Sequence, residues 1–541
     1  MLHVAALPSK RRDPCSETYG AGLSKKWGEA PLLRVAALPS KRRDPSSESN
    51  GAGLSKKQVE DLAVMLEWRA SPPFAVFTKE EMPMSQPRQG NPLGYAPIPR
   101  LMVKFAVPSI IAMLVGSLYN IVDQFFIGRA VGTLGNAATN VAFPLTTSCL
   151  ALALMFGIGG ASCFNLSMGS GDKERAPYFM GNALVMLAVC GTALCLVAQA
   201  FLDPLLVLFG SPADVMPYAQ EYVRITSLGF PFLLVTTGGG HLIRADGSPR
   251  MTMICNLTGA IINTILDALF VMVLGWGMAG AAWATVIGQV VSAVIVILYM
   301  RRPKTVPLKR EHFRLRLKYV QRIASIGAAS FFNQVAMMVV QITLNNSLRY
   351  WGALSVYGES IPLAVAGIVM KVNQVFFSVV IGISQGAQPI ESFNYGAKQF
   401  PRVRRAYLTA AILAGSVSLM SFLCFQTIPR EIISFFGTGS EAYYEFGVNF
   451  FRLFLFFTWL NFLQPITSTF FTSIGKPLRG IFLSLTRQII FLLPLILLLP
   501  RMMGIDGILY AGPTADLLSA VCAVVMAMMA FRDMRKLEAN A

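Results

Sequence analysis

Gly277-Met278-Ala279-Gly280-Ala281-Ala282-Trp283-Ala284 recurs 227 positions later as Gly504-Ile505-Asp506-Gly507-Ile508-Leu509-Tyr510-Ala511. Both copies continue to a Ser-Ala-Val, at positions 292–294 and 519–521. A second stretch, residues 244–249, matches residues 472–477 at an offset of 228. Several matches at nearly one offset indicate a chain built from two similar halves, an organisation typical of membrane transporters.

The composition predicts a membrane protein. Hydrophobic residues make up 54% of the 541 residues, and the mean hydropathy is +0.55. Apolar runs of about 20 residues with few charges are typical of bilayer-spanning helices. We therefore predict an all-α integral membrane protein with twelve transmembrane helices. Their predicted ranges are 104–128, 139–165, 177–202, 217–242, 251–275, 278–300, 319–349, 361–388, 404–428, 443–470, 480–500 and 504–531.

The repeat divides these spans into two lobes of six helices. Because each lobe has an even number of spans, both lobes have the same orientation in the membrane. They are then related by a pseudo-two-fold axis along the membrane normal, with a cavity between them. The predicted boundaries are 100–302 for the N-lobe, 303–318 for a cytoplasmic linker and 319–541 for the C-lobe.

The chain has a net charge of +18, and the distribution of its basic residues indicates the membrane topology. Basic residues gather in alternate loops, and the linker between the lobes is especially rich in them. This asymmetry predicts that the basic loops and both termini are cytoplasmic. It also argues against a nucleic-acid partner, because the charge follows the loops and forms no binding face.

Residues 1–99 differ from the rest of the chain. Val4 to Lys26 reappears nearly unchanged as Val35 to Lys57, a tandem duplication. The repeat contains Pro, Gly, Ser and clustered Lys and Arg, a composition typical of disordered segments. We expect a basic, disordered tail, and an alternative is that the mature chain begins at Met84. The eight cysteines form no Cys-x-x-Cys pair and are expected to be small packing residues.

Two acidic residues inside predicted spans stand out, Asp123 in the first and Asp267 in the fifth. A charged side chain at the bilayer centre costs about 2.5–3.5 kcal/mol, so an intramembrane acid is a functional candidate. Tyr119 lies one turn before Asp123, and Asn263 lies one turn before Asp267. Thr285 in the sixth span adds a hydroxyl.

These five side chains predict an ion-coupling site. The oxygens of Asp123, Asn263, Asp267 and Thr285 are suitable ligands for a small hard cation such as Na⁺. The site suits a proton equally, because burial and a second carboxyl both favour the protonated form. The alternative is that each acid is only hydrogen-bonded at the end of a span. The second half does not repeat the pair, since Phe491 and Leu495 stand where Asn263 and Asp267 stand in the first.

The second half offers other polar groups within its spans. Lys371 and Asp516 are a candidate buried ion pair, unless Asp516 caps local backbone instead. Flexible Met with aromatic residues is typical of promiscuous sites for bulky apolar cations, although core packing uses the same residues. The candidate substrate-cavity residues are Asn120, Asn256, Met337, Gln341, Asn345, Gln374 and Phe376.

Several motifs together resemble the multidrug and toxic compound extrusion (MATE) family over residues 100–535. They are Pro108-Ser109 followed by Tyr119-Asn120-Ile121-Val122-Asp123, then Gly382-Ile383-Ser384-Gln385-Gly386-Ala387-Gln388-Pro389, and Phe393-Asn394-Tyr395-Gly396-Ala397. Within the family the chain looks like the DinF-like branch, which includes MepA-type exporters. That branch carries its cation site in the N-lobe, which falls here on Asp123, Asn263, Asp267 and Thr285. The NorM-like branch would also have acids in spans 7 and 10, and here Gln334, Gln341 and the run around Asn461 and Gln464 offer no such acid.

The resemblance implies a secondary active multidrug efflux antiporter that exports organic cations in exchange for H⁺ or Na⁺. It is expected to be a multi-pass monomer in the bacterial inner membrane. The alternative is a lipid-linked oligosaccharide flippase of the same superfamily, for which Arg487 is one of few phosphate-binding candidates. An integral-membrane enzyme is not expected, because three histidines and no Asp-Asp-x-x-Asp motif leave little catalytic apparatus. No cofactor and no catalytic residue is predicted.

Overall fold

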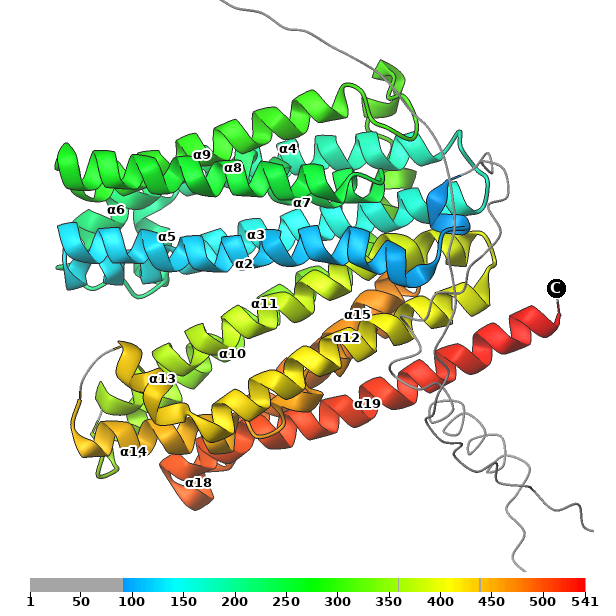
Figure 1. Ribbon diagram of the computed structural model, residues 1–541. Helices are drawn as coiled ribbons and strands as arrows, with labels where there is room; N and C mark the ends of the chain where they lie inside the picture. Colours follow the sequence, from blue (N-terminus) through cyan, green and yellow to red (C-terminus); the bar gives the residue numbers. More distant parts are fainter. Residues whose placement is uncertain (1–90, 359, 437–438, 541) are drawn as a thin grey trace, which may run out of the picture. The chain divides into compact units, whose positions relative to one another are not determined.

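The structure is a computed structural model that describes residues 91–358, 360–436 and 439–540 (Figure 1). The chain divides into two units, Met1–Pro72 and Pro73–Ala541, and all described residues belong to the second. The described residues form helices and no strand, which confirms the all-α class predicted from the sequence.

The first half contains six crossings. Its elements are η2 (Pro92–Gly94), α2 (Ile98–Ala130), α3 (Thr133–Gly169), α4 (Ala176–Ala200), α5 (Leu202–Leu208), α6 (Met216–Thr226), η3 (Ser227–Gly229), α7 (Phe230–Ala245), α8 (Pro249–Asp267), η4 (Ala268–Val273) and α9 (Gly277–Met300). Proline begins α4, α7 and α8 within the first two positions, where its missing N–H costs no helical hydrogen bond.

The second half follows a short connection with η5 (Arg310–Phe313). Its elements are α10 (Leu317–Ala353), α11 (Ser360–Gly396), α12 (Phe400–Thr427), α13 (Pro429–Phe436), α14 (Glu441–Asn449), η6 (Phe450–Phe454), η7 (Thr458–Leu460), α15 (Leu463–Ser473), α16 (Pro477–Leu485), η8 (Thr486–Leu492), α17 (Leu493–Leu498), α18 (Pro500–Met503) and α19 (Ile505–Ala539).

The fourth predicted span, 217–242, is a broken helix. Eleven helices in the described residues are long and apolar enough to cross a membrane alone. The fourth crossing is made by α6 and α7, which are separated by the 3₁₀ turn η3. Pro231 follows this turn, and a proline inside one continuous helix would remove a backbone hydrogen bond. The prediction of a single uninterrupted span was therefore wrong in detail.

The predicted tail lies outside the described residues up to position 90. Its last nine residues are ordered, so the prediction of disorder was wrong for them. Leu93 in η2 is buried, and its carbonyl oxygen accepts hydrogen bonds from Asn394 Nδ2 and Arg402 Nη2, both at 3.0 Å. Arg402 Nη2 also donates to the Ala96 carbonyl at 2.7 Å. These backbone hydrogen bonds and the buried Leu93 side chain hold residues 91–99 against the second half.

The connection between the halves is fixed to the first half by two buried side chains. Asp246 accepts hydrogen bonds from the backbone N–H groups of Lys304 at 2.6 Å and Thr305 at 2.9 Å. Asn182 Oδ1 accepts from the backbone N–H of Arg316 at 2.9 Å. The basic connection is therefore docked on the helices and does not hang free.

The two halves meet along a seam in which α2 packs against α11 and α3 packs against α10 (Figure 1). A Cβ on Gly327 of α10 would collide with the carbonyl oxygen of Met155 on α3, so this close approach requires glycine. Gln388 on α11 donates to Ser162 Oγ at 2.9 Å. The first helix of each half thus packs on the second helix of the other, as expected for halves related by a pseudo-two-fold axis.

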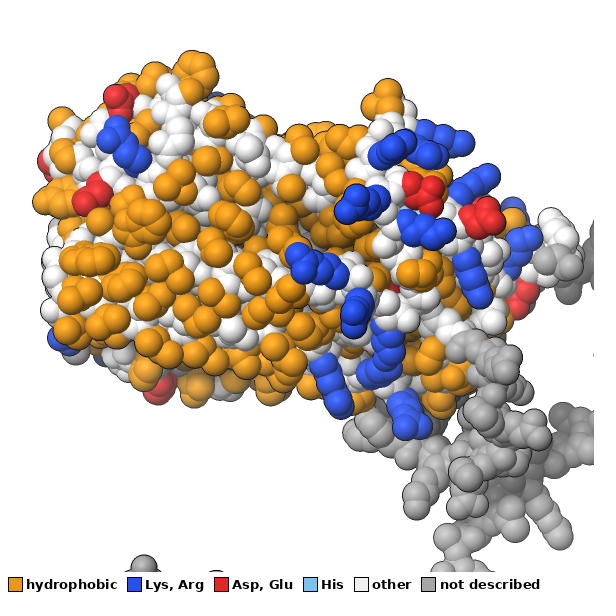
Figure 2. All heavy atoms as spheres, turned by 90° about the horizontal axis from the view of Figure 1, so that it is seen from above, with side chains coloured by type: hydrophobic (Ala, Val, Ile, Leu, Met, Phe, Trp, Pro, Cys, Tyr) orange, Lys and Arg blue, Asp and Glu red, His pale blue; other side chains and the backbone are white. Residues whose placement is uncertain are grey.

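Figure 2 shows one face of the molecule with hydrophobic side chains over most of its length. Lys and Arg side chains gather toward one end of this face. Exposed large hydrophobic residues are numerous in both halves, for example Leu196 at 64% exposure in the first half and Leu478 at 81% in the second. A surface this apolar between polar ends is suited to the interior of a bilayer.

Candidate functional site

Asp123 and Asp267 meet inside the first half. Asp123 lies on α2 and is 8% exposed, and Asp267 is the last residue of α8 and is 0% exposed. The two carboxyl groups lie close enough to interact electrostatically. Asp123 Oδ1 and both carboxyl oxygens of Asp267 have no hydrogen-bond partner.

Three further predicted residues complete the cluster. Asn263 Nδ2 donates to Thr285 Oγ1 at 3.3 Å, and the Asn263 side chain also interacts with Asp267. Tyr119 on α2 interacts with Asp123, with Asp267 and with Thr285 of α9. The structure therefore brings together all five side chains that the sequence nominated, from α2, α8 and α9.

Close packing of α8 on α9 places Asn263 beside Thr285. A Cβ on Gly288 of α9 would lie 2.8 Å from the Gly259 carbonyl oxygen of α8, which is closer than a side chain permits. After Asp267 the helix continues as the π-helix η4. Single-turn π segments inside α-helices are frequent at functional sites.

The cluster presents several buried oxygens that lack hydrogen-bond donors. They belong to Asp123, Asp267 and Asn263. An unsatisfied buried acceptor is costly, and a bound proton or small cation would satisfy it. Among the described residues, no three His, Cys, Asp or Glu side chains gather to hold a metal ion. The donor set is thus one of hard oxygens with two carboxyl groups.

Tyr222 on α6 is an additional neighbour of the cluster. It interacts electrostatically with Asp123, Tyr119 and Asp267. The sequence did not indicate this residue, because α6 is joined to α7 only through η3 and its register against α2 and α8 is not readable from periodicity.

The comparison with known families decides what kind of protein carries this cluster. The family model described as MatE matches residues 108–269 and 325–498, together more than half of the chain. The chain belongs to the MatE family. Members of this family are transporters, and the resemblance drawn from the motifs is confirmed.

Curated relatives cover most of the chain at low identity. One is the "Multidrug export protein MepA" of Staphylococcus aureus (strain MRSA252), 21% identical over 432 residues, which are 80% of this chain and 94% of that protein. Another is the "FAD transporter" of Shewanella oneidensis, 24% identical over 454 residues, which are 80% of this chain and 95% of that protein.

Solved structures of the family share the fold. A "multidrug resistance MATE family transporter of the MOP superfamily" in an outward-facing conformation matches with a TM-score of 0.77 and 20% identity over 84% of this chain and 100% of that one. A MOP superfamily transporter from Pyrococcus furiosus matches with a TM-score of 0.77 and 20% identity over 83% of this chain and 100% of that one. The likeness confirms the predicted fold of twelve helices in two lobes.

The predicted substrate-cavity residues of this MatE protein are spread over four helices. On α10, Gln341 Nε2 donates to Asn345 Oδ1 at 3.0 Å, and Asn333 Nδ2 donates to the sulfur of Met337 at 3.6 Å. Both pairs are contacts within one helix. They show no convergence of the predicted set on a single pocket.

The remaining members of that set lie apart. Asn120 on α2 is exposed and bonds the Gly116 carbonyl at 2.7 Å, and Asn256 on α8 is half-buried. Gln374 on α11 is exposed. Phe376 lines a small cavity of the second half and packs edge-on against Phe425, with ring centroids 5.4 Å apart.

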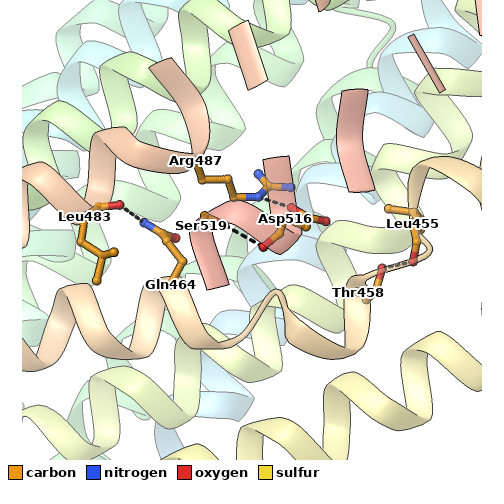
Figure 3. A network of polar contacts seen from close by, with 7 residues as sticks. All are labelled: Leu455, Thr458, Gln464, Leu483, Arg487, Asp516 and Ser519. Atoms are coloured by element: carbon orange, nitrogen blue, oxygen red, sulfur yellow. Dashed lines mark hydrogen bonds and ion pairs between the residues drawn. The ribbon is translucent and has the colours of Figure 1, made fainter. Parts of the chain in front are cut away.

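The second half of this MatE protein carries a different buried charge arrangement (Figure 3). Arg487 Nε donates to Asp516 Oδ1 at 2.6 Å, and the two side chains are 15% and 1% exposed. Ser519 Oγ donates to the Asp516 carbonyl at 3.0 Å. Lys371 instead donates to Gln124 Oε1 of α2 at 3.0 Å. The predicted Lys371–Asp516 pair was therefore wrong, because a guanidinium on the neighbouring η8 reaches Asp516 first.

Glu391 on α11 is a buried acid that sequence reasoning missed. It is 1% exposed, and its carboxyl interacts with Ser473 of α15. The predicted eighth span ended at residue 388, whereas α11 continues to Gly396. Extending the span by two turns through the Gly-Ala-Gln-Pro-Ile-Glu run would have placed this acid inside the helix bundle.

Proposed function

We propose that this MatE protein is a secondary active multidrug efflux antiporter that exports organic cations in exchange for H⁺ or Na⁺. The observation that carries the proposal is the buried Asp123–Asp267 pair, whose oxygens lack partners. The name of the Staphylococcus aureus relative, a multidrug export protein, supports efflux as the direction of transport.

The pair supplies the chemistry of coupling. When the site holds a proton or Na⁺, the repulsion between the two carboxylates is relieved and α2 is held to α8. When the ion leaves, two negative charges face each other with no compensating cation in the cluster. The ion must bind the two access states with different affinity, since an ion bound equally in both states drives nothing.

Both ions fit the donor set. A proton would bridge the two carboxyl groups, whereas Na⁺ would use oxygens of Asp123, Asp267, Asn263 and Thr285. Efflux from proteoliposomes under an imposed pH gradient, and separately under a Na⁺ gradient, identifies the coupling ion. The same liposomes without a gradient give the uncoupled rate.

Substitution of Asp267 tests the proposal in cells. Asp267→Asn is expected to abolish ethidium efflux from energised cells while expression is retained. Asp203→Asn is the matched control, because Asp203 is an exposed acid that accepts a hydrogen bond from Gln220 outside the cluster. Efflux by Asp267→Asn at the wild-type rate would refute the coupling role.

The alternative, a lipid-linked oligosaccharide flippase, needs basic side chains that can bind phosphate. The sequence offered Arg487 for this role, but its guanidinium is bonded to Asp516. FAD, the substrate in the name of the Shewanella oneidensis relative, also carries phosphate groups. Its transport would likewise need basic side chains that bind phosphate. Because the charge of Arg487 is compensated by Asp516, this arginine does not supply a phosphate-binding group. This favours organic cations as substrates over lipid-linked oligosaccharides or FAD.

The remaining expectations belong to the same proposal. The protein is a multi-pass component of the bacterial inner membrane that works as a monomer, without catalytic residues or a cofactor. Its basic end and both termini face the cytoplasm. Labelling of single cysteines introduced in the α3–α4 and α9–α10 connections, by a membrane-impermeant reagent in intact cells, checks the orientation; labelling there would contradict it.

A further inference from the structure

A cavity of about 260 Å³ lies where the two halves meet, at the opposite end of α3 from the Asp123–Asp267 cluster. The end of α3 and its connection to α4 contribute Ser167, Ser170 and Arg175. The first turns of α10 contribute Arg322 and Ile326. The walls of this cavity therefore come from both halves of the protein.

The polar side of the cavity carries a net positive charge. Arg175 Nε lies 3.3 Å from Asp172 Oδ2, a pair that is exposed at 66% and 36%. Arg322 has no carboxylate within ion-pair distance among the described residues. Two guanidinium groups therefore face one carboxylate. The Ser167 hydroxyl adds a hydrogen-bond donor beside them, whereas the Ser170 hydroxyl donates to the Ser167 carbonyl at 3.0 Å.

The other side of the cavity is apolar. Leu166, Phe179 and Ile326 form it, and Ile326 is fully buried. The volume is below the roughly 300–1,000 Å³ of sites for drug-sized ligands. Such a site is too small for a bulky exported cation, and its charge has the wrong sign. It suits the phosphate of a small amphipathic anion.

We propose that this cavity binds the phosphate group of an anionic lipid. It lies at the end of the molecule where basic residues gather (Figure 2), and basic pockets between membrane helices at such an end bind anionic headgroups. Arg175 and Arg322 hold the phosphate from the two sides of the seam, and the apolar wall receives the glycerol backbone.

A headgroup held in this way joins the two halves. The site is complete only while the end of α3 and the start of α10 are together, because each contributes one arginine. A ligand shifts an equilibrium toward the state that it binds better. The lipid therefore favours the state in which the halves meet at the basic end. This consequence for transport rests on the proposed antiport, whereas the binding itself does not.

Lipid retention by the purified full-length protein tests the proposal without any transport measurement. The probe is dioleoylphosphatidylglycerol in neutral detergent, and native mass spectrometry counts the molecules retained. Wild-type protein is expected to retain one tightly bound molecule. Because each basic residue near an anionic surface contributes about fivefold to binding, Arg175→Gln/Arg322→Gln is expected to bind about 25-fold more weakly.

Two matched variants complete the experiment. Arg314→Gln/Lys318→Gln removes the same charge from exposed positions that do not line the cavity, and is expected to bind like wild type. Asp172→Asn removes the carboxylate that competes for Arg175 and is expected to bind more tightly. Equal weakening in the cavity and control variants, or no effect of any variant, would overturn the proposal. Thermal melting of each variant confirms that it is folded.

Inorganic phosphate distinguishes the source of the anion. If millimolar phosphate displaces the lipid from wild-type protein but not from the arginine variant, the cavity recognises the phosphate group itself. If phosphate has no effect while the lipid binds, the apolar wall is required and the ligand is a lipid. Failure of both probes to bind wild-type protein would sink the site and leave the antiport proposal untouched.

Discussion

The helix pair α8–α9 of the first half corresponds in the repeat to α16–η8 and α19 of the second half. The two regions differ in whether their buried acids are bonded to a basic side chain. In the first half, Gly259 and Gly288 let the helices touch, and Asp267 keeps unpaired oxygens. In the second half, Arg487 stands at the position of Gly259 and is bonded to Asp516. The first half therefore holds carboxyl groups that have no basic partner, and the second half holds a carboxylate that is bonded to an arginine.

This difference is the basis for our inference that the two halves have different roles. Buried carboxyl groups without a fixed cation can take up and release an ion, because their charge is compensated only when the ion is bound. A buried carboxylate bonded to arginine is compensated permanently and does not exchange. We infer that the first half carries the coupling ion and that the second half supports it as a structural partner.

The largest effect is expected from the acid pair itself. Asp123→Asn and Asp267→Asn should each remove nearly all dependence of ethidium binding on the coupling ion, and the double variant should be no worse than either single one. Side chains that form one site are not additive. Equilibrium binding at several pH values and Na⁺ concentrations measures this dependence, and additive losses would show that the two acids act separately.

The next effect concerns stability in the second half. Arg487→Met leaves Asp516 buried and uncompensated, and is expected to destabilise the protein by about 3–5 kcal/mol. Arg487→Met/Asp516→Leu removes both charges and should recover most of that loss. Thermal melting in detergent compares the two variants. A double variant as unstable as the single one would mean that the pair is not a closed unit.

A moderate effect is expected where the helices of the first half touch. A Cβ at Gly259 would meet the Ser292 hydroxyl and the Gly288 backbone, so Gly259→Ala should destabilise the protein by about 1–3 kcal/mol and separate Asn263 from Thr285. Gly367→Ala is the control, because no atom lies within 4 Å of its Cβ position. It should be neutral or slightly stabilising. Equal behaviour of the two variants would argue against close packing as the cause.

The smallest effect is expected at Lys371. Its hydrogen bond to Gln124 is exposed, so Lys371→Met should cost below about 1.5 kcal/mol. Combined with Asp516→Asn, its effect on melting should add within about 0.5 kcal/mol, since the two residues share no contact. A coupling free energy above about 1 kcal/mol between the two substitutions, which is typical of residues in contact, would show that Lys371 and Asp516 interact after all.

The fold could be predicted largely from the sequence, because each crossing needs a long apolar run. The exceptions were the fourth and tenth crossings, which are interrupted by the 3₁₀ turns η3 and η7. Asp123 and Asp267 were also predictable, since acids are rare inside spans and their neighbours one turn away share a face.

Other parts of the site were not readable from the sequence. Arg487 and Asp516 belong to different helices, and which of several cations reaches an acid depends on helix rotation and crossing angle. Tyr222 approaches the acids from α6, whose break from α7 resets its register. Glu391 was missed because the predicted span ended at residue 388, whereas α11 continues to Gly396.

Gradient-driven transport in proteoliposomes tests the central claim most directly. Ethidium movement is measured with and without the coupling gradient in wild type, in Asp267→Asn and in Arg487→Met/Asp516→Leu. We predict that the gradient accelerates transport in wild type and in the second-half variant but not in Asp267→Asn. Acceleration in Asp267→Asn, or its loss only in the second-half variant, would contradict the assignment of coupling to the first half.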